Sequence, residues 1–294
     1  MATARMNKLA RLAAAAAFAA AAGCGALEQK NNDDKYAAFS DPTVIGQFTR
    51  NVNTHYNDIA RCQSALAGFV TDAMLASVSG GEFAVINAGS VRFSPSLSLD
   101  DYIPAGPVTG TDVAQFLPFD NPSRATPATI VLIDLSAAVI KQMFENGFSR
   151  MTADGKEGTS FGRFLQVSHT VRVQADVRQP TGQRVTAITL TDGDGGSVET
   201  IYPNGSGRTY RVAVPLKYIK NTTGFSDFDQ YWNILATGSN VVDTKARIYD
   251  AVVNTISARS PVTLVEVYPF TKPDVISVTA NCDNPSNRLV ILHN

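Results

Sequence analysis

The stretch TIVLIDLSAAVIKQMFENGF, residues 129–148, decides how this chain folds. Its first seven residues are mostly apolar and β-branched, which is typical of a buried strand. Ser136 follows at the position of a helix N-cap, and residues 137–148 repeat large apolar side chains at helical spacing. A strand that leads directly into a capped helix predicts a domain whose sheet and helices share one core.

The segments on either side add more strands and helices. Strands are expected over residues 82–87 (EFAVIN), 164–175 (FLQVSHTVRVQA), 184–190 (RVTAITL) and 209–215 (TYRVAVP). Helices are expected over 41–77 in two parts, over a short stretch that Thr111 caps, and over 243–258. The stretch DGDGG at 192–196 predicts a hairpin turn, because it lacks the later acidic ligands of a calcium loop. Helices mixed with antiparallel hairpins indicate the α+β fold class.

The composition excludes several classes of protein. The chain has 294 residues, of which 44% are hydrophobic, and 25 basic residues balance 26 acidic ones. This is too polar for a protein of many membrane spans and too apolar for a disordered chain. A net charge of −1 gives no basis for nucleic-acid binding. We therefore expect a globular protein that has no nucleic-acid partner.

The N-terminus is typical of an export signal. Arg5, Lys8 and Arg11 precede an apolar run at 12–22, which is too short to span a bilayer as a helix. The run ends in AAGC, which resembles a bacterial lipobox with Cys24 as the lipidated residue. We expect a signal peptide over 1–23 and a tether over 24–40, with plain secretion as the alternative. The expected location is the bacterial cell envelope, with a lipid anchor in the membrane.

Two further cysteines, Cys62 and Cys282, remain in the exported chain. In an oxidising compartment they form one even pair, so a disulfide between them is expected. Two buried free thiols are the alternative.

Six separated blocks occur in the order and spacing of a known domain. They are 87–92 (NAGSVR), 103–121 (with IPAGPVT, DV and LPFDN), 162–168 (GRFLQVS), 180–185 (PTGQRV), 210–213 (YRVA) and 260–262 (SPV). Together they resemble the C-terminal domain of the 5′-nucleotidase family, which includes UDP-sugar hydrolases. The resemblance implies a layered α/β/β/α fold with mixed sheets over 41–275, followed by a C-terminal extension at 276–294.

The resemblance also implies that metal binding belongs to a different domain of the family's proteins. Family members carry an N-terminal metallophosphatase domain, whose motifs D-x-H and G-N-H-[ED] hold two divalent metals. Neither D-x-H nor G-N-H occurs in this sequence. We therefore expect no metal or other cofactor here, no catalytic residue, and no hydrolysis by this chain alone.

The family's C-terminal domain holds the nucleoside between two aromatic rings. The resemblance assigns these rings to Phe119 and Tyr218, a base or ribose contact to Asn87, and a ribose or phosphate contact to Arg92. Asp227 takes the place of the family's aspartate, in a loop that has lost its glycine pair. The alternatives are a core position for Phe119 and a turn-bracing role for Asn87 and Arg92.

The N-terminal signal predicts an exported lipoprotein, and the resemblance implies that it binds a nucleotide or nucleoside in the service of nucleotide catabolism. One alternative is the substrate-binding half of a two-chain nucleotidase, with a separate metallophosphatase protein as its partner. The other is an interaction or structural lipoprotein whose pocket has decayed.

Overall fold

The computed structural model describes residues 39–91, 102–120, 122, 128–153, 161–192, 196–219, 231, 233–264, 282 and 288–292. Cys24, Arg92 and Asp227 lie outside the described residues, as does nearly all of the expected signal and tether. Within the described part, no helix is long and apolar enough to cross a membrane.

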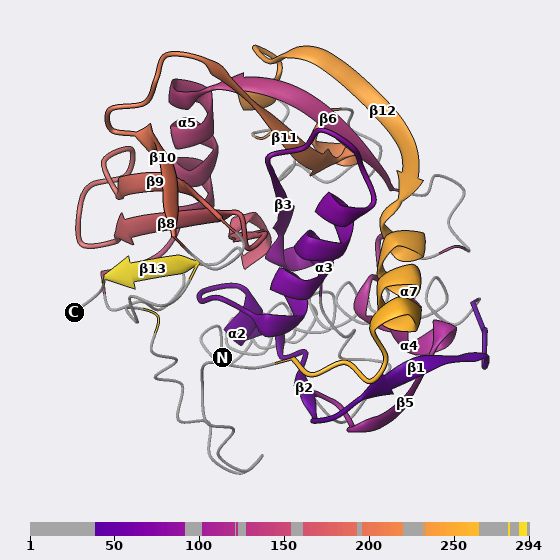
Figure 1. Ribbon diagram of the computed structural model, residues 1–294. Helices are drawn as coiled ribbons and strands as arrows, with labels where there is room; N and C mark the ends of the chain where they lie inside the picture. The colour runs from indigo at the N-terminus through magenta and orange to yellow at the C-terminus, as the bar shows by residue number, and fades with distance from the viewer. Residues whose placement is uncertain are drawn as a thin grey trace, which may run out of the picture.

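A five-stranded sheet forms the centre of the molecule (Figure 1). Its strands, in spatial order, are β12 (Ser239–Arg247), β6 (Thr129–Ser136), β11 (Thr209–Pro215), β3 (Phe83–Asn87) and β7 (Leu165–Val167). β3 and β11 run parallel, and the other neighbouring pairs are antiparallel. This mixed orientation confirms the expected mixed-sheet α+β fold.

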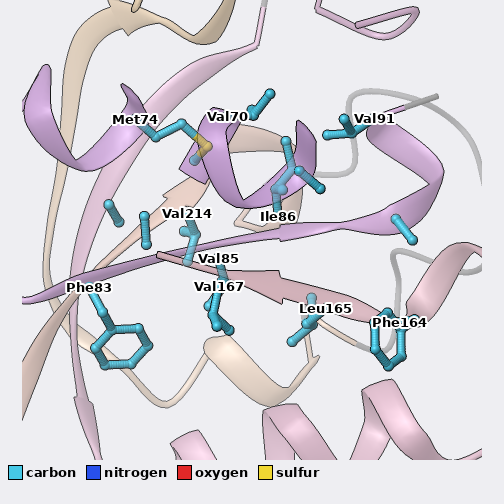
Figure 2. Close-up of a cluster of buried hydrophobic side chains, with 14 of the residues drawn as sticks. Val70, Met74, Phe83, Val85, Ile86, Val91, Phe164, Leu165, Val167 and Val214 are labelled. Atoms are coloured by element: carbon cyan, nitrogen blue, oxygen red, sulfur yellow. The ribbon is translucent and has the colours of Figure 1, made fainter. Parts of the chain in front are cut away.

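Both faces of β3 are buried, and its five residues are all inaccessible to solvent. Figure 2 shows Met74 and Val70 of helix α3 (Ala65–Ala76) on one side of the strand and Val85 on the other. Ser64 caps α3 by accepting a hydrogen bond from the amide of Ala67 at 3.2 Å. Side chains packed on both faces therefore hold β3 in place up to Asn87, where the next turn begins.

Helix α5 (Ala137–Phe148) follows β6 directly, as the sequence predicts. Ser136 caps it through the amide of Val139 at 3.4 Å. Near its other end, Phe148 packs edge-on against Phe164, with 5.8 Å between the ring centroids.

A second sheet has four strands, in the order β10 (Ser197–Tyr202), β9 (Val185–Thr191), β8 (Val171–Asp176) and β13 (Leu289–Leu292). β13 runs parallel to β8 and forms one edge of the sheet (Figure 1). This strand comes from the segment 276–294, which the sequence places beyond the domain as an extension.

Smaller elements complete the fold. β1 (Val44–Phe48) pairs with β5 (Gly106–Thr109), and β2 (Val52–Asn53) pairs with β4 (Tyr102–Ile103). The remaining α-helices of the described residues are α2 (Tyr56–Ile59), α4 (Gly110–Phe116) and α7 (Ile248–Arg259).

Four predictions of local structure were wrong in part. Residues 44–48 form β1 rather than helix, because β5 offers them a pairing partner. The expected strand 164–175 is two strands in different sheets, separated by a turn at Ser168–Thr170. The expected helix 243–258 is strand up to Arg247 and helix after it. Thr109, rather than Thr111, caps α4, and its side chain forms a capping box with Asp112.

The edge strand β13 is held by several contacts to the segment around α3. Cys62 and Cys282 form a disulfide, with 5.4 Å between their Cα atoms, as predicted. The side chain of Gln63 accepts hydrogen bonds from the amides of Arg288 and Leu289. The guanidinium of Arg288 donates to both carboxylate oxygens of Asp72, at 3.1 and 2.9 Å.

A buried carboxylate joins α5 to the β8–β9 hairpin. Glu145 is 5% exposed and accepts hydrogen bonds from the amides of Gly182, Arg184 and Val185 at 2.9–3.1 Å. Lys141 donates to the same carboxylate at 2.9 Å. Arg184 in turn donates to the carbonyl oxygens at the end of α5 and beyond it. Burial lowers the pKa of Arg184, and the charge of Glu145 partly offsets this effect.

Candidate functional site

The turn after β3 carries the first residue that the sequence assigns to a ligand. Asn87 ends the strand, and residues 88–90 form the 3₁₀ turn η1 (Ala88–Ser90). The side-chain amide of Asn87 donates to the carbonyl of Gly162 at 2.6 Å. A side-chain carbon at Gly89 would lie 3.2 Å from the Cα of Gly162, so the missing side chain at Gly89 allows the two segments to approach closely.

A second turn, η3 (Leu216–Tyr218), reaches the same place from the end of β11. The hydroxyl of Tyr218 donates to Oδ1 of Asn87 at 2.8 Å and accepts a hydrogen bond from the Asn87 backbone amide. Burial above all, with contributions from Tyr231 and Asp120, raises the pKa of Tyr218 well above its ordinary value. The phenol therefore stays protonated and acts as a permanent donor to Asn87.

Tyr231 covers one face of Tyr218. The two rings stack with 5.2 Å between their centroids and 22° between their planes. Both side chains are completely buried, and the hydroxyl of Tyr231 donates to the carbonyl of Arg163. The ring of Tyr231 therefore makes that face of Tyr218 unavailable to a ligand.

A buried lysine extends the same network. Lys217 is 2% exposed, and its ammonium donates to the hydroxyl of Ser90. Ser90 in turn donates to Oδ1 of Asn87 at 2.5 Å. Three turns, η1, η3 and the one at Gly162, are therefore joined by side chains.

Phe119 comes to this network from a third part of the chain. It lies just after α4, in a turn where the amide of Asp120 donates to the carbonyl of Leu117 at 2.9 Å. The ammonium of Lys217 stands 5.4 Å from the centroid of its ring. Phe119 keeps part of its surface exposed, whereas Asn87, Lys217 and Tyr218 are buried.

The structure thus brings together three of the five expected ligand residues, Asn87, Phe119 and Tyr218. Tyr218 offers no exposed face, and Asn87 accepts two hydrogen bonds at its side-chain oxygen within the protein. Asn87 therefore braces the turn in this structure, which was one of its two expected roles. The other two expected residues, Arg92 and Asp227, lie outside the described residues.

Sequence reasoning missed Lys217, the residue that faces Phe119. One signal was present, because the lysine interrupts the apolar stretch VPLKYI at 214–219. A lysine in such a stretch is a candidate for a buried charge, which the fold must pair with polar or aromatic groups.

Nowhere in the described ranges do three His, Cys, Asp or Glu side chains gather where they could hold a metal ion.

Comparison with known proteins completes the description. The sequence profile of the family described as "5′-nucleotidase, C-terminal domain" matches residues 44–230. The chain belongs to this family. No curated protein sequence matches the chain.

Solved structures agree with this assignment of the 5′-nucleotidase C-terminal domain. A 5′-nucleotidase precursor from Thermus thermophilus is 28% identical, with a TM-score of 0.57 over 74% of this chain. The NAD nucleotidase of Haemophilus influenzae is 18% identical, with a TM-score of 0.55 over the same share, and shows the fold alone. The match spans 36% of the length of each of these two proteins.

Proposed function

We propose that this domain binds a nucleotide or nucleoside beside Phe119 and serves nucleotide breakdown. The observation that carries the proposal is the convergence of three segments that the family uses for its ligand. The turn at 87–90, Phe119 and the turn at 216–218 meet in one network of contacts. Phe119 keeps exposed surface, whereas the ring of Tyr218 is buried, so Phe119 is the ring on which a base would stack.

Binding without catalysis is the second part of the proposal. The sequence contains neither of the family's metal-binding motifs, D-x-H and G-N-H. We expect the purified chain to release no phosphate from AMP when Mn²⁺ or Zn²⁺ is added. Turnover that a chelator abolishes, and that follows this polypeptide through purification, would refute this part. If a separate metallophosphatase protein supplies the chemistry, adding it should produce turnover, and this chain would be the substrate-binding half of a two-chain nucleotidase.

The third part is export with a lipid anchor at Cys24. The basic residues, the short apolar run and the sequence AAGC support it. Mass spectrometry of the membrane-extracted protein should find cleavage before Cys24 and a diacylglycerol on its sulfur. An unmodified Cys24, or cleavage elsewhere, contradicts the anchor but leaves ligand binding untouched.

One observation favours a different function. Tyr218 and Asn87 satisfy each other inside the protein, and Tyr231 covers Tyr218, so this part of the site is closed. A lipoprotein that serves as a structural or interaction module would need no open pocket there.

Calorimetry separates the two functions. The purified chain should bind at least one of adenosine, AMP and UDP-glucose. Phe119→Ala should weaken that binding by about 1–3 kcal/mol, because a base loses its stacking partner. Phe39→Ala is the matched control, since Phe39 is also a partly buried ring but packs on Tyr249, with 5.6 Å between the ring centroids. Absence of binding by the folded wild type would leave the interaction module as the better interpretation.

A further inference from the structure

Lys217 occupies one face of the ring that the proposed function gives to the ligand. Its ammonium is 5.4 Å from the Phe119 centroid, and its side chain is buried between that ring and the hydroxyl of Ser90. A base that stacked between them would need about 7 Å, twice the ordinary contact distance of about 3.5 Å. A ligand must therefore use the other face of Phe119 or shift the ammonium.

Either route brings a ligand close to a buried positive charge. Charges act more strongly in such surroundings than in water, because solvent screens them less. An anionic group on the ligand is attracted to the ammonium, whereas a neutral ligand gains nothing from it and must compete with the contact between lysine and ring. The charge of Lys217 therefore distinguishes ligands that stack on Phe119 equally well.

We propose that Lys217 is a specificity-determining residue that makes the site select anionic nucleotides over neutral nucleosides. This inference rests on the proposed function, and it narrows the ligand class from nucleotide or nucleoside to nucleotide.

Asp120 supplies the opposing charge. It follows Phe119, its side chain is 1% exposed, and its carboxylate contributes to the raised pKa of Tyr218. A negative charge at this place reduces the preference for anions that Lys217 creates. Removing the charge of Lys217 and removing the charge of Asp120 should therefore change the preference for anionic ligands in opposite directions.

The test compares the dissociation constants of AMP and adenosine for the purified full chain by calorimetry. The wild type should bind AMP about tenfold more tightly than adenosine, the size expected for one hydrogen bond to a charged group. Lys217→Met, which keeps the length and loses the charge, should abolish most of this preference. Lys217→Gln should do the same while it keeps a donor for Ser90. Asp120→Asn should increase the preference.

Lys141→Met is the matched control. Lys141 also stands 5.4 Å from the centroid of an aromatic ring, that of Tyr202, but it lies on α5 and binds Glu145. Its replacement changes the net charge by the same amount and should leave the preference unchanged.

The outcomes are distinct. If the wild type binds both ligands equally, or if both Lys217 variants retain the wild-type preference, the role of Lys217 is refuted while the proposed function stands. If the folded wild type binds neither ligand, the proposed function itself fails. If neither Lys217 variant folds, Asp120→Asn decides, since an unchanged preference in that variant overturns the inference.

Discussion

The two sheets of this protein are joined to their surroundings by different kinds of contact. The four-stranded sheet is fastened to its surroundings by a carboxylate that binds backbone amides and by a disulfide. Where β3 of the five-stranded sheet ends, side chains largely bind one another, in the series Lys217, Ser90, Asn87 and Tyr218. Contacts to the backbone fix the path of the chain, whereas contacts between side chains can be altered one at a time. We therefore expect substitutions in the first region to act mainly on stability, and substitutions in the second to act on the proposed ligand site as well.

The largest effect is expected from Glu145→Ala. The substitution leaves three backbone amides, two of them buried, and the nearby Arg184 without their acceptor or counter-charge, which should lower the free energy of unfolding by about 3–5 kcal/mol. Chemical denaturation measures this change. Lys141→Met is the control, because it removes the ion pair but leaves the amides satisfied, and it should cost under about 1 kcal/mol. Equal losses in the two variants would show that the amide contacts are unimportant.

The next largest effect should come from the double variant Cys62→Ser, Cys282→Ser. Loss of a native disulfide that closes a long loop costs about 2–5 kcal/mol. Thermal unfolding of the two proteins gives the difference. A thiol assay provides an independent check, since two reactive thiols at Cys62 and Cys282 in the denatured, unreduced wild type would mean that the bridge does not form.

In the side-chain network where β3 ends, Tyr218→Phe should have a smaller effect. The variant keeps the ring that stacks on Tyr231 but leaves the Asn87 amide without its acceptor, at a cost of about 1–3 kcal/mol. Ligand binding should fall as well, because Asn87 holds the turn that precedes Arg92. Tyr231→Phe is the matched comparison. It changes the other ring of the stack, loses the hydrogen bond from its hydroxyl to the carbonyl of Arg163, and should leave Asn87 in place. Should both variants bind ligand equally, the Asn87 bond has no part in the site.

The smallest effect concerns Asp72, which holds Arg288 beside β13. Burial raises the pKa of Asp72, but the hydrogen bond from His169 and the charge of Arg288 outweigh this, so the pKa lies below its ordinary value of 3.8. A lowered folded-state pKa stabilises the fold above pH 3.8, and this contribution is lost as the pH falls through the folded-state value. The stability of the wild type should therefore fall more steeply between about pH 5 and about pH 2 than that of Asp72→Asn. Parallel pH profiles would contradict the proposed contribution.

The parts of the fold that local sequence determines were predicted well. β6, Ser136 and α5 follow from β-branched residues, a cap and helical spacing, all within one continuous stretch of chain. Residues 44–48 were predicted as helix because their strand character depends on β5, which lies far away in the sequence. The alternation over 164–175 continues through the turn at Ser168, so the pattern alone cannot reveal that the chain changes sheets there.

The candidate site shows the same limit. Motif order located Asn87, Phe119 and Tyr218, and the structure brings the segments that carry them together. Which face of Tyr218 is free depends on Tyr231, and what lies over Phe119 depends on how η3 is turned. Neither relation is local in sequence, so the place of Lys217 in the site could not be predicted before the fold was known.

The disulfide also has a mechanical meaning. Because residues 62 and 282 are covalently joined, a pulling force applied to the two ends of the chain passes through the bridge and bypasses the 220-residue separation between them. The bridge closes a loop between residues 62 and 282. Of the described elements, β1, β2, α2 and β13 lie outside this loop, so the pulling force would act on them. All strands of the five-stranded sheet and three of the four strands of the second sheet lie inside the loop. Stretching the chain would therefore detach the elements outside the loop first, while the turns that carry Asn87, Phe119 and Lys217 kept their contacts.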